Sequence, residues 1–392
     1  MTKPSLNQST ENADLSTLTP AMRQFIEIRT EVAKQHPNIL LLYRMGDFYE
    51  TFFEDAVEIN RLLGITLTSR GKGKPDAIPM AGVPFMTLDS YLARLVKLGK
   101  SVGIVEQIGD PAAVKGTMPR KLVRIVTPGT ITEDELLPAK ADAALIAVCP
   151  PSGKKSPQWS VVSLVLSSGA FKGFCCTEDE LPGEIARISP QEILIPDSCR
   201  ETAKSFSGAA QLTPLPDWHF DPKHGTDELL HHFNMENLDA WAVSEKPGVL
   251  AAAGAILGYV EQTQVDAVPH IRPLVFEESS RFVGLDPSSR RNLELTEPLR
   301  SENGPTLFST IDHCHTSMGS RMLRSWITQP LRDPTVPRAR HEAVREMIEN
   351  ESLRDALSEP LKNLPDLERV ASRIALGSVR PRELSGLRDA LP

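Results

Sequence analysis

An aromatic ring and a carboxylate stand two positions apart near the start of the chain, at Phe48 and Glu50. The apolar run at residues 39–43 ahead of them predicts a buried strand, and the apolar spacing from Phe48 to Ile59 predicts a helix. The pair is therefore expected where a strand turns into a helix, a position that is exposed but anchored at both ends. A ring can stack on a flat ligand there, and a carboxylate can accept hydrogen bonds.

Two interpretations of Phe48 and Glu50 remain open from the pattern alone. In the first, Phe48 belongs to the core of the helix and Glu50 is a first-turn acid favoured by the helix dipole. In the second, both side chains contact a ligand. The surrounding charge favours the second, because residues 61–130 carry 11 basic and 4 acidic side chains, a net charge of +7 that suits a polyanion.

Length and composition describe a protein of several domains with uneven charge. A chain of 392 residues is too long for one ordinary core, so two to three domains are expected. The net charge of −8 conceals an acidic middle, since residues 131–280 hold 10 basic and 22 acidic side chains, a net charge of −12. Five cysteines without zinc-site spacing indicate reduced thiols in a cytoplasmic protein. No apolar run is long enough to span a bilayer, so no membrane partner is expected.

The chain divides into a tail and three segments of different character. Residues 1–19 are polar and are expected to be disordered. Strands and helices alternate in residues 20–130, which predicts a mixed α/β domain, and residues 131–280 predict a second α/β domain with a ribonuclease-H-like sheet. Residues 281–392 predict an all-α segment, so the fold class is α/β multidomain followed by helices. The apolar stripe at the end of the chain finds no partner downstream, which indicates a fragment of a longer protein.

Periodicity and capping residues predict the individual elements of these segments. Helices are expected from residue 20 and over 88–98, 180–188, 225–243, 248–263, 306–311, 317–327, 334–349 and 380–390, and one is expected to start at 288–295. Strands are expected over 64–70, 101–107, 120–127, 159–166, 169–174 and 192–196, with a strand-like entry at 282–286.

Two further motifs resemble sites of known chemistry but differ from them in detail. Residues 98–101 (Leu-Gly-Lys-Ser) resemble the end of a phosphate-binding loop, but the glycine required five residues before Gly99 is Arg94. Gly99 is better explained as the end of the preceding helix. The His-Cys-His sequence at 313–315 offers too few ligands for structural zinc, and a loop is expected there. No cofactor is therefore expected in this chain.

The segment from Gly46 to Glu50 also resembles the Phe-x-Glu motif of the MutS family, whose members detect mismatched bases in DNA. Further blocks resemble bacterial MutS in the same order along the chain, from about residue 20 to the end. They are residues 78–84 (IPMAGVP), 106–111 (EQIGDP), 124–130 (RIVTPGT), 286–295 (DPSSRRNLEL) and 318–323 (MGSRML). Their number and order make the resemblance specific.

The resemblance implies a role for each segment. Residues 20–130 are expected to form the mismatch-binding domain, residues 131–280 the connector domain, and residues 281–392 the start of the helical core, or lever, domain. The implied function is recognition of mismatched or looped base pairs in duplex DNA to initiate mismatch repair.

For the site, the resemblance implies that Phe48 is a wedge that stacks on a mispaired base from the minor groove. It implies that Glu50 accepts a hydrogen bond from that base, while Tyr49 packs in the core. Basic side chains of the same domain are candidates for contacts to the DNA backbone that position the duplex without reading its sequence. They are Arg70, Lys72, Lys74 and Lys100.

The chain departs from the family pattern at two positions. The family commonly carries an aromatic residue followed by His where this chain has Phe85-Met86, so a polar group is absent from the expected DNA side. Val105 stands where bacterial members often carry Cys, which is a neutral exchange in a core strand.

The resemblance also implies partners and a compartment. A MutL-type repair partner docks on the connector domain in this family, and full-length members are homodimers. ATP and Mg²⁺ are bound by a C-terminal ATPase domain, which is expected to lie beyond residue 392 together with the dimer contacts. The chain by itself is therefore expected not to be an enzyme, and to be cytoplasmic and associated with the bacterial nucleoid.

Two other functions are weighed against mismatch recognition. The acidic segment 131–280 is a poor candidate for DNA binding and a good one for protein docking, so the chain can act mainly as a docking module. A nuclease on the ribonuclease-H-like sheet requires clustered carboxylates at strand ends. The strands predicted at 159–166 and 169–174 contain none, which argues against a nuclease.

Overall fold

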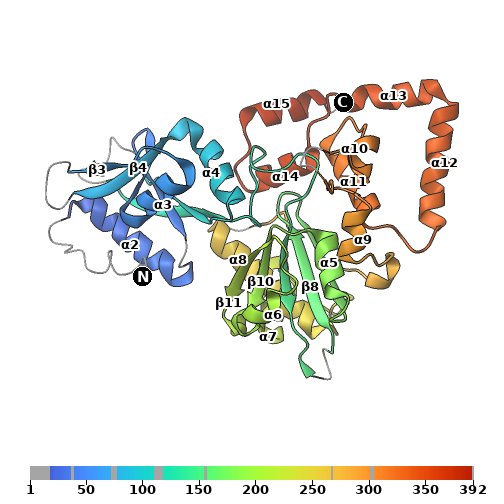
Figure 1. Cartoon of the computed structure of the whole chain (residues 1–392), viewed down its shortest axis with the longest axis horizontal. Helices are drawn as coiled ribbons and strands as arrows, with labels where there is room; N and C mark the ends of the chain where they lie inside the picture. The colour runs from blue at the N-terminus through green and yellow to red at the C-terminus, as the bar shows by residue number, and fades with distance from the viewer. Residues whose placement is uncertain are drawn as a thin grey trace. The chain divides into compact units, whose positions relative to one another are not determined.

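The computed structural model describes residues 18–36, 39–71, 77–109, 118–153, 157–265, 268–300 and 304–390 (Figure 1). The chain forms two compact units, one of Met1–Pro128 with Glu261–Asp266 and one of Gly129–Val260 with Ala267–Pro392. Most of the tail predicted at residues 1–19 lies outside the described residues. Within the described ranges no helix is long and apolar enough to cross a membrane.

The first unit is built on a six-stranded sheet in the order β3-β4-β2-β1-β5-β6. Its elements are α2 (Pro20–Gln35), β1 (Leu40–Met45), β2 (Phe48–Phe52), α3 (Phe53–Leu63), β3 (Thr68–Arg70), β4 (Ile78–Pro84), α4 (Leu88–Lys97), β5 (Val102–Gln107) and β6 (Arg120–Val126). Strands β1 and β5 run parallel, and the other neighbours run antiparallel. The mixed α/β domain predicted for this part of the chain is confirmed, although the strand predicted at 64–70 is shorter.

The core of the first unit lies between α2 and the sheet. The ring of Phe25 on α2 meets the ring of Phe52 edge-on, with centroids 5.1 Å apart, and both side chains are fully buried. A buried ion pair joins α2 to α3, with Arg29 Nε 3.1 Å from Asp55 Oδ2. The same oxygen accepts a hydrogen bond from the backbone N–H of Leu41 on β1. This network fixes β1, and therefore the strand that follows it, against both helices.

The second unit begins with another six-stranded sheet, in the order β11-β10-β7-β8-β9-β12. Its strands are β7 (Leu145–Cys149), β8 (Trp159–Val165), β9 (Ala170–Cys176), β10 (Glu192–Pro196), β11 (Gln211–Leu215) and β12 (Val275–Phe276). Strands β7, β8 and β9 are antiparallel, and β10 and β11 run parallel to β7, as a ribonuclease-H-like sheet requires. Helices α5 (Leu181–Ile188) and α8 (Pro247–Gln264) pack on opposite faces of this sheet (Figure 1).

One predicted helix of this unit has the wrong length. The spacing predicts a helix over residues 225–243, but α7 (Pro222–Phe233) ends ten residues earlier. Asn234 takes a left-handed conformation with φ +50°, which Asn tolerates better than most residues and which ends the helix. At the other end, the Asp221 carboxylate accepts from the N–H of Lys223 and caps the first turn.

Helices α7 and α8 approach each other closely through glycine. A Cβ added to Gly225 would lie 2.2 Å from the carbonyl oxygen of Leu250, and one added to Gly254 would lie 2.3 Å from the Cα of Gly225. We expect Gly225→Ala to lower the free energy of unfolding by about 1–3 kcal/mol, because the helices must separate. Urea denaturation of the 392-residue chain measures this change.

The control for this prediction is Gly258→Ala on α8, the other helix of the pair, where an added Cβ meets nothing within 4 Å. Alanine is the better helix former, so this substitution should be neutral or stabilise by up to about 1 kcal/mol. Equal losses of stability in Gly225→Ala and Gly258→Ala would mean that close packing between α7 and α8 is not what selects glycine.

The remaining part of the second unit is helical, as predicted. Its helices are α9 (Pro287–Asn292), α10 (Leu307–Ile311), α11 (Ser317–Thr328), α12 (Thr335–Glu349), α13 (Glu351–Leu361), α14 (Leu367–Ala375) and α15 (Pro381–Ala390). Side chains of Thr316 and Asp366 accept hydrogen bonds from first-turn N–H groups and start α11 and α14. The strand-like entry predicted at 282–286 is wrong, since only Phe282 forms an isolated bridge, with Leu331. Helices α13 and α14 lie where no element is predicted.

Three buried arginines, here called the arginine junction, connect this helical segment to residues 132–142. They are Arg321, Arg369 and Arg373, with relative exposures of 6%, 2% and 6%. Arg369 donates to the carbonyl oxygens of Pro138 and Ala141 at 2.8 and 3.0 Å. Because these arginines make their contacts to loop carbonyls and to carboxylates, polar rather than apolar contacts hold the junction.

Candidate nucleic-acid interface

The Phe48-x-Glu50 segment lies on a strand and not on a helix. Gly46, with φ +60°, and Asp47 make a tight turn that reverses the chain, so β2 pairs antiparallel with β1. Met45 faces Phe48 across the hairpin, and α3 begins only at Phe53. The prediction that the helix begins at Phe48 is therefore wrong, since the helix begins five residues later.

The strand geometry determines which side chains of β2 reach the surface. Alternate residues of a strand face opposite sides of the sheet. Tyr49 is buried, and its hydroxyl donates to a carboxylate oxygen of Glu106 on β5. Phe48 and Glu50 face the other way, and Phe48 is 47% exposed. The hairpin thus presents the ring and the carboxylate on one face while Tyr49 anchors the strand, in agreement with the packing role expected for Tyr49.

Phe48 has exposed apolar neighbours. Its Cα partner on β4 is Pro84, and the N–H of the next residue, Phe85, donates to the Asp47 carbonyl at 2.9 Å. Phe85 and Met86 are 45% and 86% exposed, and the Phe85 ring stacks on the Tyr49 ring, on the face of the sheet opposite to Phe48. We call Phe48, Phe85 and Met86 the apolar edge. An edge of this kind is unusual on a free surface and suits contact with flat, apolar groups such as base faces.

Glu50 lies beside this edge in a partly desolvated setting. Its side chain is 21% exposed, and its Oε2 is buried without a hydrogen-bond partner among the described residues. The nearest cation is Arg70, whose Nη1 lies 4.0 Å from that oxygen. Burial raises the pKa of Glu50, and the charges of Arg70 and Arg120 oppose this shift only in part. An unsatisfied buried acceptor is destabilising in the free protein and gains from a donor that arrives with a ligand.

The four candidate backbone contacts are distributed unevenly over the first unit. Arg70 is next to Glu50, whereas Lys72 and Lys74 lie outside the described residues. Lys100 pairs with Glu58 at 3.1 Å, and it precedes β5, whose start faces Leu40 at the start of β1. Phe48 faces the far end of β1, and a six-residue strand is about 20 Å long. The structure therefore does not bring Lys100 to the apolar edge.

Two basic residues near the apolar edge are absent from the sequence-based set. Arg44 places its guanidinium 3.8 Å from the centroid of the Phe85 ring, and Arg120 donates through Nε to the Arg44 carbonyl at 2.8 Å. Both lie at the end of the sheet that carries Phe48. Their sequence signal is weak: Arg44 directly precedes the hairpin turn, and Arg120 is the first residue of a strand.

The second unit gives little support for a nuclease site. Glu192 is a buried carboxylate on β10, but it accepts from Gly129 N, Thr213 Oγ1 and the Tyr259 hydroxyl at 3.0, 2.6 and 2.7 Å. A carboxylate held by three donors serves to tie strands together. Within the described ranges no group of three or more His, Cys, Asp or Glu side chains is placed to hold a metal ion.

Comparison with known protein families gives three matches along the chain. Residues 19–135 match MutS domain I, residues 143–272 match MutS domain II, and residues 288–392 match MutS domain III. The hairpin that carries Phe48 falls in the first match, the ribonuclease-H-like sheet in the second, and most of the helical segment in the third. With domains I, II and III matched in order over nearly all of its length, the chain belongs to the MutS family and comprises an N-terminal portion of it.

Proposed function

We propose that this chain recognises mismatched or looped base pairs by inserting Phe48 into duplex DNA, with Glu50 as the discriminating group. MutS domains I to III imply recognition of mismatched DNA in repair. The observation that carries the finer proposal is the pairing of a half-exposed ring with a buried, unpartnered carboxylate oxygen on one face of a rigid hairpin.

The physical basis is a balance between unstacking and stacking. Opening one base step costs a few kcal/mol, and less where the base is already mispaired, so deformation alone favours a mismatch. Stacking of the Phe48 ring on a base returns about 1–3 kcal/mol and tolerates every base. The exposed Phe85 and Met86 add apolar surface at the same end of the sheet, where Arg44 adds a positive charge. Met86 thereby replaces a polar contact of the family by an apolar one.

Glu50 supplies selectivity by repulsion as well as by hydrogen bonding. A carboxylate close to phosphates is unfavourable unless a base donor satisfies it, and a matched pair in the stack offers none at that place. The buried Oε2 atom is suited to this role because it has no hydrogen bond to give up among the described residues, and its ion pair with Arg70 is long, at 4.0 Å.

Other properties are proposed from the family alone. They are docking of a MutL-type partner on the connector domain, dimer formation and ATP and Mg²⁺ binding by full-length members, and a cytoplasmic location. A second candidate function, protein docking as the main role of this chain, is favoured by the net charge of −12 over residues 131–280.

The test of the proposed function is a gel-shift series with three duplexes of equal length: matched, mismatched and looped. The expected result is tighter binding of the mismatched and looped duplexes, with affinity that falls as salt rises. Equal affinity for all three duplexes would overturn the proposal, and no binding to any of them would favour the docking function.

Replacing Glu50 by glutamine tests the discriminating role. The substitution keeps shape but removes the charge, so affinity for matched duplex should rise by roughly 5- to 10-fold, which is about 1 kcal/mol of relieved repulsion. Fluorescence anisotropy with matched and mismatched duplexes measures the two affinities. Glu58→Gln is the matched control, because Glu58 lies on α3 and pairs with Lys100 at the other end of the sheet. Unchanged affinity of Glu50→Gln for matched duplex would contradict the role.

The same variant makes a prediction about stability and pH. Burial raises the pKa of Glu50 above its ordinary 4.5. At pH values between 4.5 and the raised pKa, the folded chain therefore binds a proton that the unfolded chain does not. Stability therefore falls as pH rises through that window, and the charged form is disfavoured at neutral pH. Glu50→Gln should raise the free energy of unfolding at pH 7 by an amount on the order of 1 kcal/mol and flatten this pH dependence. A variant that is less stable than the native chain at pH 7 would refute this account.

A further inference from the structure

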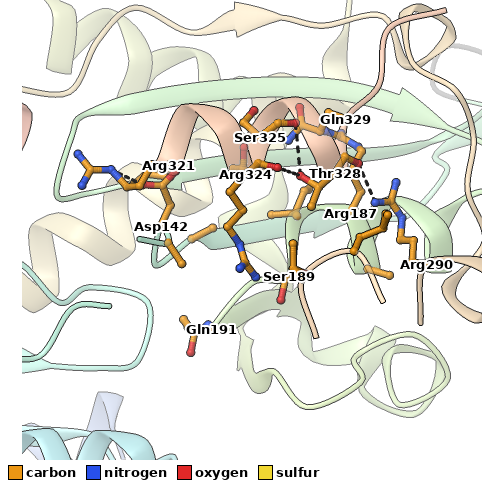
Figure 2. Close-up of a pocket in the computed structure, with 18 of the residues that line it drawn as sticks. Asp142, Arg187, Ser189, Gln191, Arg290, Arg321, Arg324, Ser325, Thr328 and Gln329 are labelled. Atoms are coloured by element: carbon orange, nitrogen blue, oxygen red, sulfur yellow. Dashed lines mark hydrogen bonds and ion pairs between the residues drawn. The ribbon is translucent and has the colours of Figure 1, made fainter. Parts of the chain in front are cut away.

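A cavity of ≈ 440 Å³ lies within the second unit. It is lined by the turn between α5 and β10, by residues of α9 and α11, and by one face of β8 and β9. Figure 2 shows that α11 lines it with Arg324, Ser325 and Thr328, followed by Gln329 just after the helix. This volume lies in the range of small-molecule sites, which runs from about 300 to 1,000 Å³.

Charge in this cavity is unbalanced. Six lining side chains are cationic and three are anionic. Two of the three carboxylates are already engaged, Glu277 with Lys172 at 2.8 Å and Asp142 with Arg321 at 3.4 Å. The third, Glu297, is exposed at the rim. Arg187 and Arg321 also pair with carboxylates outside the lining, Glu184 at 2.7 Å and Asp366 at 2.5 Å. The remaining positive charge of the cavity therefore belongs to Arg290, Arg291 and Arg324.

Arg324 is one of three lining arginines, with Arg290 and Arg291, that form no ion pair with the residues that the structure describes. Its side chain extends from α11 toward the turn that carries Ser189, as Figure 2 shows, and among the described residues it has no ion pair within 4.0 Å. Its guanidinium lies 5.6 Å from the centroid of the Phe308 ring. Burial lowers the pKa of Arg324, and the charges of Glu297 and Asp142 oppose that shift without reversing it.

Arg290 is a second cation, held in place from α9. It donates through Nη1 to the Thr328 carbonyl at 2.7 Å and through Nε to the Leu285 carbonyl at 3.2 Å. Burial lowers the pKa of Arg290, and the nearby positive charge of Arg187 lowers it further. Backbone oxygens therefore hold the Arg290 guanidinium without neutralising its positive charge.

We propose that this cavity is a binding site for a phosphate-bearing small anion, with Arg324 as its principal ligand and Arg290 as the second. The planar donor fork of arginine matches the oxygens of a phosphate group. The hydroxyls of Ser189 and Ser325 and the amide of Gln191 line the same cavity and provide neutral donors. The site is independent of mismatch recognition, so either proposal can fail while the other holds.

Isothermal titration calorimetry of the 392-residue chain tests this site with three probes, inorganic phosphate, pyrophosphate and ATP, at constant ionic strength. The expected result is saturable binding of at least one probe with one site per chain, and at least tenfold weaker binding to Arg324→Gln. Arg324→Lys keeps the charge but loses the planar donor fork, so its affinity should lie between those of the native chain and Arg324→Gln. Arg338→Gln is the matched control, because Arg338 is exposed on α12 outside the cavity.

The outcomes separate the possible sources of the phosphate group. Tightest binding of inorganic phosphate or pyrophosphate indicates a free anion, and tightest binding of ATP indicates a nucleotide. Since Arg324 has no ion pair to lose, Arg324→Gln should unfold at the same temperature as the native chain when no probe is present, which distinguishes lost binding from lost structure. Equal binding by the native chain and Arg324→Gln, or no saturable heat with any probe up to about 10 mM, would overturn the proposal.

Discussion

Phe48→Ala is expected to remove the preference for mismatched over matched duplex and to leave weak, salt-sensitive DNA binding. The ring is 47% exposed in the free protein, so its loss leaves no cavity in the core. The stacking that it contributes to the complex is worth about 1–3 kcal/mol, which corresponds to a loss of roughly 5- to 150-fold in affinity for a mismatch. Anisotropy titrations with matched and mismatched duplexes at two salt concentrations measure the mismatch preference and the salt-sensitive binding that remains.

Two further variants test whether the mismatch preference depends on the aromatic ring of Phe48. Phe48→Tyr keeps an aromatic face and should retain the preference. Trp218→Ala removes a 58% exposed aromatic side chain from the second unit and should leave both affinities unchanged. If Phe48→Ala and the native chain show the same ratio of mismatch to matched affinity, the wedge role is wrong and the apolar edge acts in some other way.

Local signals in the sequence account for most of the fold. The apolar run before the hairpin, the proline that opens α2 and the glycine that closes α4 are each sufficient to place an element boundary. Gly99, for instance, has φ +70° at the end of α4, as a helix-ending glycine should. These signals act within a few residues of one another and require no knowledge of the tertiary structure.

The error at Phe48 has an equally local origin. Phe48 and Phe52 are four residues apart, and residues at that spacing share one face of a helix and also one face of a strand. The apolar spacing was therefore ambiguous over the first turn. The tight turn at Gly46 decides between the two, because a chain that reverses there can pair β2 with β1 across the hairpin.

Long-range contacts explain what the sequence did not reveal at the site. Arg44 and Arg120 lie 76 residues apart in the chain. They meet because their strands, β1 and β6, both pair with β5. Glu50 and Arg70 likewise meet through β4, which pairs with both of their strands. Which basic residues of a domain surround a wedge is thus a property of strand order, and strand order cannot be derived from periodicity.

Buried charge in the helical segment was hidden for the same reason. Arg321 and Arg369 are charged residues of α11 and α14, yet their side chains are only 5% and 2% exposed. Arg369 contacts residues 138 and 141, more than 200 residues earlier in the chain, and Arg321 pairs with Asp366, 45 residues later. The carboxylate that both arginines share, Asp366, is where the largest change in stability is expected.

Asp366→Ala is expected to lower the free energy of unfolding of the second unit by about 1.5–3 kcal/mol, because it removes the carboxylate that the buried Arg321 and Arg369 share. Arg321 keeps Glu368 and Asp142 as partners, and Arg369 keeps Asp134, so neither charge is left uncompensated. Asp366 Oδ2 lies 2.5 Å from Arg321 Nη1 and 3.7 Å from Arg369 Nε. Its Oδ1 also caps α14 by accepting from the Arg369 N–H, a further loss of about 1 kcal/mol. Thermal and urea denaturation measure the total, and Asp366→Asn, which keeps an acceptor for the cap, separates the charge from the cap.

The pH dependence of stability gives an independent check on the same carboxylate. Burial by itself would raise the pKa of Asp366, but hydrogen bonds and charge from Arg321 and then Arg369 hold it below the usual 3.8. Its contribution is therefore complete above pH 3.8 and is lost as pH falls through the lower, folded value. The free energy of unfolding of Asp366→Asn should lack this loss at low pH. Asp389→Ala, which removes an exposed partner of Arg388, should change stability by less than about 0.5 kcal/mol. A loss of that small size in Asp366→Ala would show that the arginine junction is held by its backbone carbonyl contacts and not by charge.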